Sequence, residues 1–199
     1  MIDLCILIPA AGASSRMRGS DKLLEEIDGE SLLHRTARIA RAATPSVLVT
    51  LPESGPCVPA RLAALVGSNA RILRIGDAHD GMSASLRAAS REIGQAEGLM
   101  ILLPDMPEIG LEDIERLKAA FAEDPARPVR AATGDGTELG HPVILPRRYM
   151  QELAVLTGDR GARHLIEGDD IRIVPLPGRR AVTDLDTPEA WEAWRASRV

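Results

Sequence analysis

Residues 8–22 read Ile-Pro-Ala-Ala-Gly-Ala-Ser-Ser-Arg-Met-Arg-Gly-Ser-Asp-Lys, and the rest of the chain is organised around this stretch. The apolar run that precedes it, residues 4–8, indicates a buried strand. Pro9 ends that run, and the small residues after it indicate a loop whose backbone a ligand can approach closely. The chain therefore begins with a strand that leads into a binding loop.

The loop has the chemistry that phosphates require. Its small residues keep side chains away from a ligand, while its hydroxyls and cations can bind an anion. These residues are Ala10, Ala11, Gly12, Ala13, Ser14, Ser15, Arg16 and Lys22. The pattern is not a P-loop, in which Ser or Thr follows the lysine, and it lacks the three glycines of a dinucleotide fingerprint. An ordinary glycine-containing turn with solvated charges is the alternative.

Strand-like and helical segments alternate along the rest of the chain. Apolar, β-branched runs predict strands over residues 4–8, 46–51, 71–75, 99–103, 142–145 and 171–175. Helical spacing predicts helices over residues 31–43, 59–66, 83–94, 111–122, 147–156, 160–167 and 188–196. Such alternation predicts an α/β fold, a single domain over residues 1–199 with a mostly parallel sheet covered by helices on both faces.

Composition excludes several classes of partner. Aromatic residues are only 2% of the 199 residues, and the formal net charge is −5. Few aromatic side chains and no basic excess speak against a nucleic-acid-binding protein. No apolar stretch is long enough for a membrane span, and Cys5 and Cys57 match no metal-binding spacing. We expect a cytoplasmic protein with a small anionic ligand.

Carboxylates at two places in the chain could bind a divalent cation. Asp105 follows the strand predicted at residues 99–103, and Asp184 and Asp186 precede the last predicted helix. Mg²⁺ prefers carboxylate oxygens and keeps waters and substrate phosphates as its other ligands, so Asp105 and one further aspartate suffice. We prefer Asp186, which is nearest the helix start. Asp105 could instead belong to a turn or cap a helix, and Asp186 or Thr187 could be the N-cap of the last helix.

Two further segments could bind a base or a phosphate. Gly81 and Ser85 lie at the start of a predicted helix, where backbone N–H groups and hydroxyls are available. Arg160 and Arg163 are three residues apart, a spacing that places two guanidinium groups on one helix face. A serine-capped helix and a solvated helix face are the corresponding alternatives.

The order of these segments resembles a known family. Residues 9–17, the segment Asp21-Lys22-Leu23-Leu24 and the segment Gly29-Glu30-Ser31-Leu32-Leu33 resemble the signature of nucleotidyltransferases with a glycosyltransferase-A-like, three-layer α/β/α fold. Five later segments are similar to the molybdenum cofactor cytidylyltransferase branch. They are Gly81-Met82, Pro104-Asp105-Met106-Pro107, Gly140-His141-Pro142-Val143, Gly158-Asp159-Arg160-Gly161-Ala162-Arg163 and Asp184-Leu185-Asp186-Thr187-Pro188-Glu189.

The resemblance implies a reaction and a role for each residue. The terminal phosphate of molybdopterin would attack the α-phosphorus of CTP, and pyrophosphate would leave. Arg16 and Lys22 would neutralise the triphosphate together with Mg²⁺ on Asp105 and Asp186. The backbone around residues 10–12, with Gly81 and Ser85, would face the nucleoside, and His141, Arg160 and Arg163 would face the pterin side. A molybdoenzyme would be a possible recipient of the product.

Three alternatives remain open from the sequence. A guanine-transferring relative would use GTP. A different acceptor, such as a sugar or alcohol phosphate, would keep the chemistry, and the opening Ile-Pro-Ala-Ala-Gly is also similar to cytidylyltransferases of isoprenoid synthesis. A nucleotide-binding module without catalysis is the alternative from another functional class.

Overall fold

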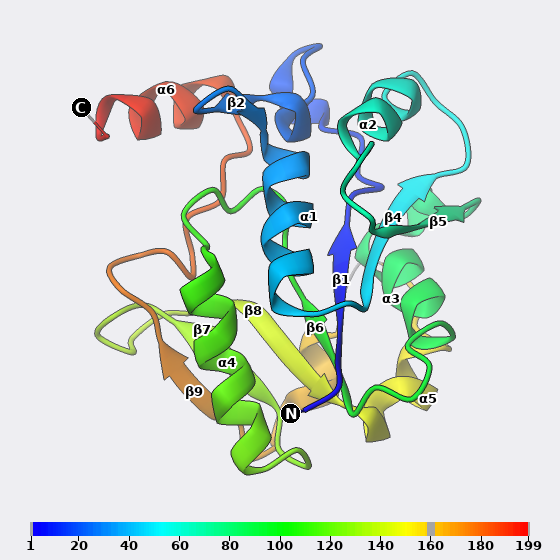
Figure 1. Ribbon diagram of the computed structural model, residues 1–199, viewed down its shortest axis with the longest axis vertical. Coiled ribbons are helices and arrows are strands. Elements are labelled where there is room, and N and C mark those ends of the chain that lie inside the picture. Colours follow the sequence, from blue (N-terminus) through cyan, green and yellow to red (C-terminus); the bar gives the residue numbers. More distant parts are fainter. Residues whose placement is uncertain (1, 159–161, 199) are drawn as a thin grey trace.

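A seven-stranded sheet forms the centre of the protein in a computed structural model that describes residues 2–158 and 162–198 (Figure 1). In sheet order, the strands are β5 (Arg71–Ile75), β4 (Val47–Pro52), β1 (Leu4–Pro9), β6 (Gly98–Ile101), β8 (Leu139–Pro146), β7 (Val129–Ala132) and β9 (Arg172–Pro175). Strand β8 runs antiparallel to both neighbours, and all other neighbouring pairs are parallel. The predicted α/β class with a mostly parallel sheet is confirmed.

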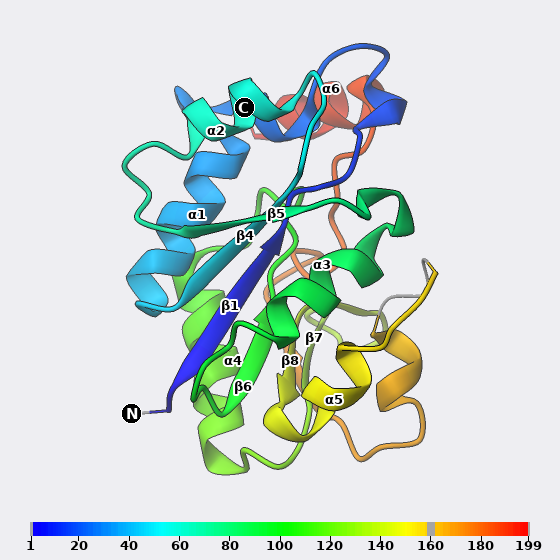
Figure 2. The same cartoon turned by 90° about the vertical axis from the view of Figure 1, so that its right-hand side faces the viewer.

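Helices cover both faces of the sheet (Figure 2). They are α1 (Leu32–Ala43), α2 (Val58–Ala64), α3 (Met82–Ser90), α4 (Leu111–Glu123), α5 (Met150–Leu153) and α6 (Pro188–Ala196). Short 3-10 turns are η1 (Ser15–Met17), η2 (Lys22–Leu24), η3 (Ala78–Asp80), η4 (Arg147–Tyr149) and η5 (Arg163–Ile166), and a small hairpin pairs β2 (Glu26–Ile27) with β3 (Glu30–Ser31).

Strand β1 explains why the first apolar run has no polar alternation. Leu4, Ile6 and Ile8 pack into the core beneath α1 and α4, whereas Cys5 and Leu7 pack into the core beneath α3 and α5. A central parallel strand is buried on both faces, so both sets of side chains must be apolar. The strand therefore ends at its ligand-facing loop with its position fixed from both sides.

Parts of the fold differ from the prediction. Strand β7 and the β2–β3 hairpin were missed, and the helix predicted over residues 147–156 is the turn η4 followed by the short α5. Of the helix predicted over residues 160–167, the described part contains only the 3-10 turn η5. Strand β7 reads Val-Arg-Ala-Ala, which has little β-propensity of its own. Pairing with β8 and β9 on either side stabilises it instead.

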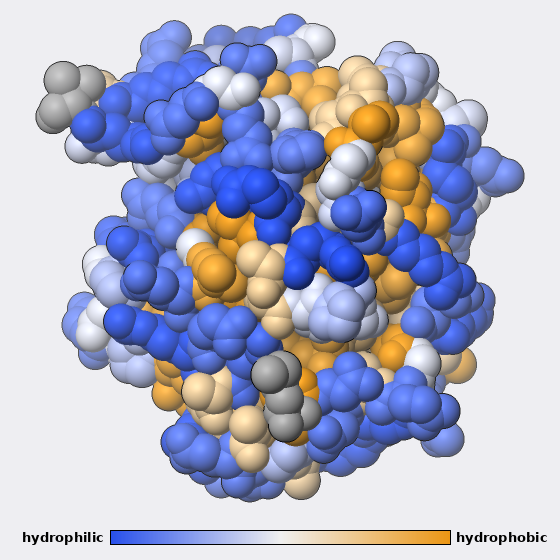
Figure 3. All heavy atoms as spheres, viewed as in Figure 1, coloured by the Kyte–Doolittle hydropathy of each residue, from blue (hydrophilic) through white to orange (hydrophobic). Residues whose placement is uncertain are grey.

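The visible surface is mostly hydrophilic, with small apolar areas between charged side chains (Figure 3). Within residues 2–158 and 162–198, no helix has both the length and the apolar character to cross a membrane.

Candidate active site

The loop after β1 is held in one conformation by its backbone and by its neighbours. Ala10 N–H donates to the Thr50 carbonyl of β4 at 3.0 Å, which continues the sheet pairing one residue beyond the strand. Ser14 and Arg18 have positive φ angles of 50° and 52°, a region that few residues other than glycine adopt. At the loop's end, Asp21 accepts from Leu23 N–H at 3.1 Å and so caps η2, which places Lys22 at the start of that turn.

Lys22 joins two aspartates from distant parts of the chain. Its Nζ lies 2.5 Å from Asp105 Oδ2 and 2.5 Å from Asp186 Oδ1, and Arg16 Nη2 lies 2.7 Å from Asp186 Oδ2. A backbone bond from Leu185 N–H to the Asp105 carbonyl, at 3.0 Å, fixes the two acidic segments together. The loop, Asp105 and Asp186 thus converge at one place, as the sequence predicted.

The charges in this cluster act on one another. Burial alone would lower the pKa of Lys22, but the carboxylates of Asp105 and Asp186 outweigh burial and raise it. Burial raises the pKa of Asp184, and the neighbouring carboxylates of Asp186 and Asp105 raise it further. Three aspartates therefore share a small region, with Lys22 and Arg16 as their counterions.

Neither Asp105 nor Asp186 caps a helix, although Asp105 does lie in a turn, one of the two alternatives for it. Thr187 caps α6 by accepting from Ala190 N–H at 3.2 Å, so Asp186 is not the cap. The N-cap of α4 is Gly110, so Asp105 does not cap that helix; it lies in a turn five residues before Gly110.

The donor set fits a hard divalent cation. Asp105 Oδ1 is buried and has no hydrogen-bond partner, so one carboxylate oxygen is left for a further ligand. Across the described ranges, no three acidic, histidine or cysteine side chains converge as a metal cluster. Two carboxylates suit an ion such as Mg²⁺, which takes its remaining ligands from water and phosphate.

A cavity of about 210 Å³ opens beside this cluster. The β1 loop and Asp105 form one side, and Gly81, Met82 and Ser85 at the start of α3 form the other. Ser85 Oγ accepts from Thr50 Oγ1 at 2.8 Å, which ties α3 to β4 beneath the cavity. The predicted residues Ala11, Gly12, Lys22, Gly81, Ser85 and Asp105 all line it.

Not every predicted loop residue reaches the cavity. The Ala10 and Gly12 carbonyls and the Ser14 hydroxyl are bonded to Arg61, and Ser14 also donates to Asp21 Oδ1 at 2.9 Å. Ala13 is exposed and does not line the cavity. A nucleotide contact by Ala10, Ala13 or Ser14 stays a prediction.

The residues predicted for the acceptor are only partly described. His141 N–H donates to the Ala181 carbonyl at 2.8 Å, and its Nδ1 is buried with no partner. Burial, with repulsion from Arg130, lowers the pKa of His141 to about 4 despite the nearby Asp105 carboxylate. Arg160 lies outside the described residues, and Arg163 is placed only as the first residue of η5.

Gly140 explains how the last acidic segment is brought to the site. A Cβ at this position would lie 1.7 Å from the Ala181 carbonyl oxygen, so only glycine allows the chain to pass this close to β8. Five residues after Ala181, the same segment presents Asp186.

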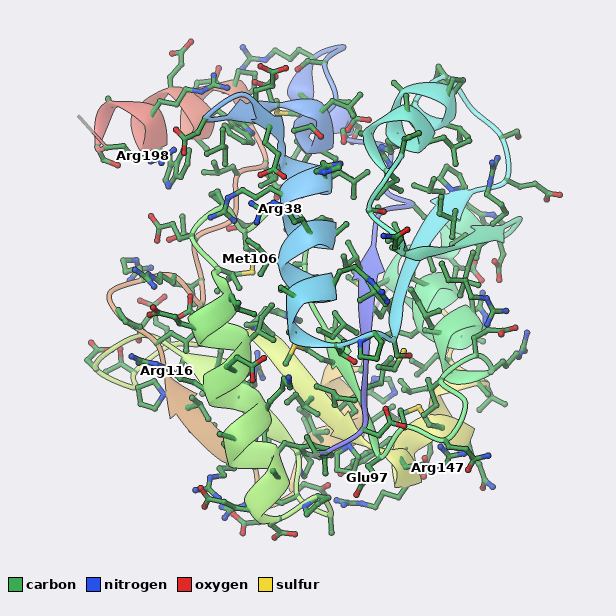
Figure 4. All side chains as sticks on the ribbon, viewed as in Figure 1. Arg38, Glu97, Met106, Arg116, Arg147 and Arg198 are labelled. Atoms are coloured by element: carbon green, nitrogen blue, oxygen red, sulfur yellow. The ribbon has the colours of Figure 1, made fainter. Side chains whose placement is uncertain are left out.

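A larger hollow of about 820 Å³ lies between α6, α1 and the loop before residue 184. Its lining includes Arg35, Arg179, Arg180 and Arg198, the last of which is labelled in Figure 4. None of the predicted site residues lines this hollow, so we place the chemistry at the smaller cavity.

Sequence reasoning missed Arg61 and Asp21, which form an ion pair of 2.7 Å behind the loop. The one available signal was a charged residue within the mainly apolar stretch 58–66, and that pattern is equally typical of an exposed helix face.

The loop after β1, two carboxylates paired with cations, and a cavity at the strand ends form the arrangement expected of a nucleotidyltransferase. The profile of the MobA-like NTP transferase domain matches residues 6–174. The chain belongs to this family.

Relatives of known name span nearly the whole chain. A probable molybdenum cofactor guanylyltransferase of Synechococcus elongatus is 28% identical in an alignment 197 residues long that covers 94% of this chain and 96% of that protein. A molybdenum cofactor guanylyltransferase of Pseudomonas aeruginosa is 29% identical in an alignment 189 residues long that covers 92% of this chain and 90% of that protein.

Solved structures share the fold. The Mycobacterium tuberculosis protein Rv0371c matches with a TM-score of 0.81 and 26% identity, over 97% of both chains. Another structure of Rv0371c was solved as a complex with manganese; it has a TM-score of 0.77 and 25% identity, and the match covers 98% of this chain and 99% of that one.

Proposed function

We propose that this nucleotidyltransferase transfers CMP from CTP to the terminal phosphate of molybdopterin or the molybdenum cofactor. An oxygen of that phosphate forms a bond to the α-phosphorus, the bond from the α-phosphorus to the bridging oxygen breaks, and pyrophosphate leaves. The observation that carries the proposal is the convergence of Lys22, Asp105 and Asp186 beside the cavity at Gly12 and Gly81. The names of the relatives support the acceptor.

The residues of the site do electrostatic rather than covalent work. Phosphoryl transfer needs two anions held in line and charge neutralised on the phosphorus oxygens. Asp105 and Asp186 would hold Mg²⁺, which would supply charge neutralisation at the triphosphate. Lys22 and Arg16 add two cations at the same place, each paired with a half-buried carboxylate. No side-chain nucleophile is needed.

Cytosine as the base is carried over from the segments that resemble the molybdenum cofactor cytidylyltransferase branch. The cavity of about 210 Å³ has room for a base of either size, with sugar and triphosphate lying outside along the β1 loop, so its volume does not choose between CTP and GTP. GTP is the second candidate, because the named relatives are guanylyltransferases.

The test measures pyrophosphate released when the protein is mixed with Mg²⁺, molybdopterin and either CTP or GTP. We expect release with CTP. Faster release with GTP would reverse the choice of base, and no release with either would contradict the transfer. Replacing molybdopterin by a sugar phosphate tests the acceptor, because faster turnover of the sugar phosphate would contradict the pterin assignment.

A variant separates catalysis from nucleotide binding alone. Asp105→Ala should reduce the rate by roughly 100-fold or more, since it removes a cation ligand where charge develops. Asp170→Ala is the matched control. Asp170 lies at the surface, and among the described contacts its carboxylate pairs only with Arg127, at 2.5 Å. A wild-type protein that binds nucleotide without ever turning over would favour the non-catalytic module.

A further inference from the structure

Arg61 of α2 is a fully buried arginine that uses every donor it has. Its Nε donates to Asp21 Oδ2 at 2.7 Å, and its Nη2 donates to Asp21 Oδ1 at 2.9 Å and Ser14 Oγ at 3.1 Å. Its Nη1 donates to the carbonyls of Ala10 at 2.7 Å and Gly12 at 2.8 Å. A guanidinium group has five N–H donors, so all of them are satisfied.

These five bonds reach the beginning, middle and end of one loop. Ala10 and Gly12 lie at its start, Ser14 in its middle and Asp21 at its end. Ser14 has φ of 50°, a conformation that persists only where surrounding contacts fix it. Arg61 and Asp21 supply those contacts through the Ser14 hydroxyl.

The bonds also decide which way the loop's electronegative atoms point. Two carbonyl oxygens that would repel a triphosphate are bonded to Arg61 in the interior. The Asp21 carboxylate is neutralised in the same way: burial would raise its pKa, but the bonds from Arg61, Leu23 N–H and Ser14 lower it overall. A buried ion pair is tolerated when such additional bonds satisfy it.

Asp21 also connects Arg61 to the catalytic cluster. It caps the turn η2, in which the next residue is Lys22, the residue that bridges Asp105 and Asp186. Movement of Asp21 would therefore move the Lys22 ammonium.

We infer that Arg61 is a positioning residue, which holds the 10–21 loop and Lys22 in the arrangement that receives the triphosphate. It contacts the loop from behind and does not line the cavity, so it acts through the loop and not on the nucleotide. The inference rests on the proposed function and adds a determinant of nucleotide affinity that lies outside the site.

The first test compares Arg61→Lys with the control Lys118→Met. Lysine keeps the charge but cannot make five bonds in a fixed fork. We expect Arg61→Lys to raise the KM for the preferred nucleotide at least about tenfold, the factor that corresponds to losing one charged hydrogen bond. Lys118 of α4 is also a buried cation, bonded to Glu115 on the same helix and to the carbonyl of Ala43 at the end of α1. Lys118→Met should lower thermal stability but leave KM unchanged.

The second test does not depend on nucleotide binding. Amide hydrogen exchange in residues 10–21 of the free protein should accelerate at least about tenfold in Arg61→Lys, and not in Lys118→Met. The double variant Arg61→Met with Asp21→Asn removes both buried charges, so it should fold while showing the same accelerated exchange.

The outcomes separate the two proposals. A wild-type protein that binds neither CTP nor GTP would refute the proposed function, while loop exchange would still test Arg61. Unchanged exchange in both Arg61 variants, or Arg61→Lys with reduced stability but wild-type KM, would overturn the positioning role.

Discussion

The Lys22 ammonium lies between the two carboxylates that would bind a divalent cation. Its nitrogen lies 2.5 Å from oxygens of both Asp105 and Asp186. The lysine and a divalent ion therefore compete for the same negative charge, and the lysine must shift when an ion binds. In the proposed mechanism, Lys22 therefore assists transfer and at the same time lowers the intrinsic metal affinity of the proposed site.

Lys22→Gln should abolish transfer but raise the affinity for Mn²⁺ about tenfold in the absence of nucleotide, because two carboxylates lose their counterion. Titration followed by electron paramagnetic resonance measures this affinity, and Lys118→Gln is the matched control. Weaker or unchanged Mn²⁺ binding would show that the two carboxylates do not form the metal site.

His141 should make stability depend on pH. Its pKa is about 4 in the folded protein, against about 6.5 when unfolded. Well above pH 6.5 the His141 imidazole is neutral in both the folded and the unfolded protein, so it does not change the unfolding free energy there. As pH falls from 6.5 towards 4, the unfolded chain gains a proton that the folded protein does not, and stability falls by up to about 3 kcal/mol. Urea unfolding at pH 7 and pH 5 should show a smaller difference for His141→Gln than for wild type; an equal difference would mean that other groups cause the loss.

At the scale of elements, the segment after β9 can approach β8 closely only because Gly140 has no Cβ. Gly140→Ala places a methyl group against the Ala181 carbonyl oxygen, with 1.7 Å between them before relaxation. We expect a loss of about 1–3 kcal/mol in unfolding free energy and weaker Mn²⁺ binding, since the displaced segment carries Asp186. Gly76→Ala is the control, because the nearest atom to its Cβ would be the carboxylate oxygen at the end of the exposed, flexible Glu53 side chain, at 3.0 Å, which can move away. Equal effects of the two substitutions in urea unfolding would contradict the argument.

Elements with a strong pattern of their own were predictable. The serine-capped α1 and the proline-started α6 have their signals within a few neighbouring residues, and their predicted and observed bounds agree closely. Strand β7 has no such signal, because its pairing partners determine it. The same distinction holds in the site: Gly12, Asp105 and Asp186 follow or precede recognisable elements, whereas Arg61 matters through contacts with residues 40 to 51 positions away.

At the scale of the whole molecule, nucleotide and metal should stabilise the fold together. A ligand at 100 times its Kd adds about 2.7 kcal/mol, which for a chain of this size raises Tm by roughly 5–10 °C. Thermal scans with CTP or GTP, each with and without Mg²⁺, should show a shift that needs both components. In Asp105→Asn the part that depends on Mg²⁺ should vanish; a full shift in that variant would place the ion elsewhere.

The reversed direction of β8 has a consequence for how the protein can diversify. Because β8 runs against β6, the chain enters it at the edge of the sheet where the parallel strands end. The turn over residues 133–138 therefore lies at that edge without a crossover, where Gly134 N–H donates to the Gly178 carbonyl at 2.8 Å, and its length can change while the strand order beneath it stays the same. The β7–β8 hairpin can therefore vary without altering β1 and β4, on which the proposed nucleotide site is built.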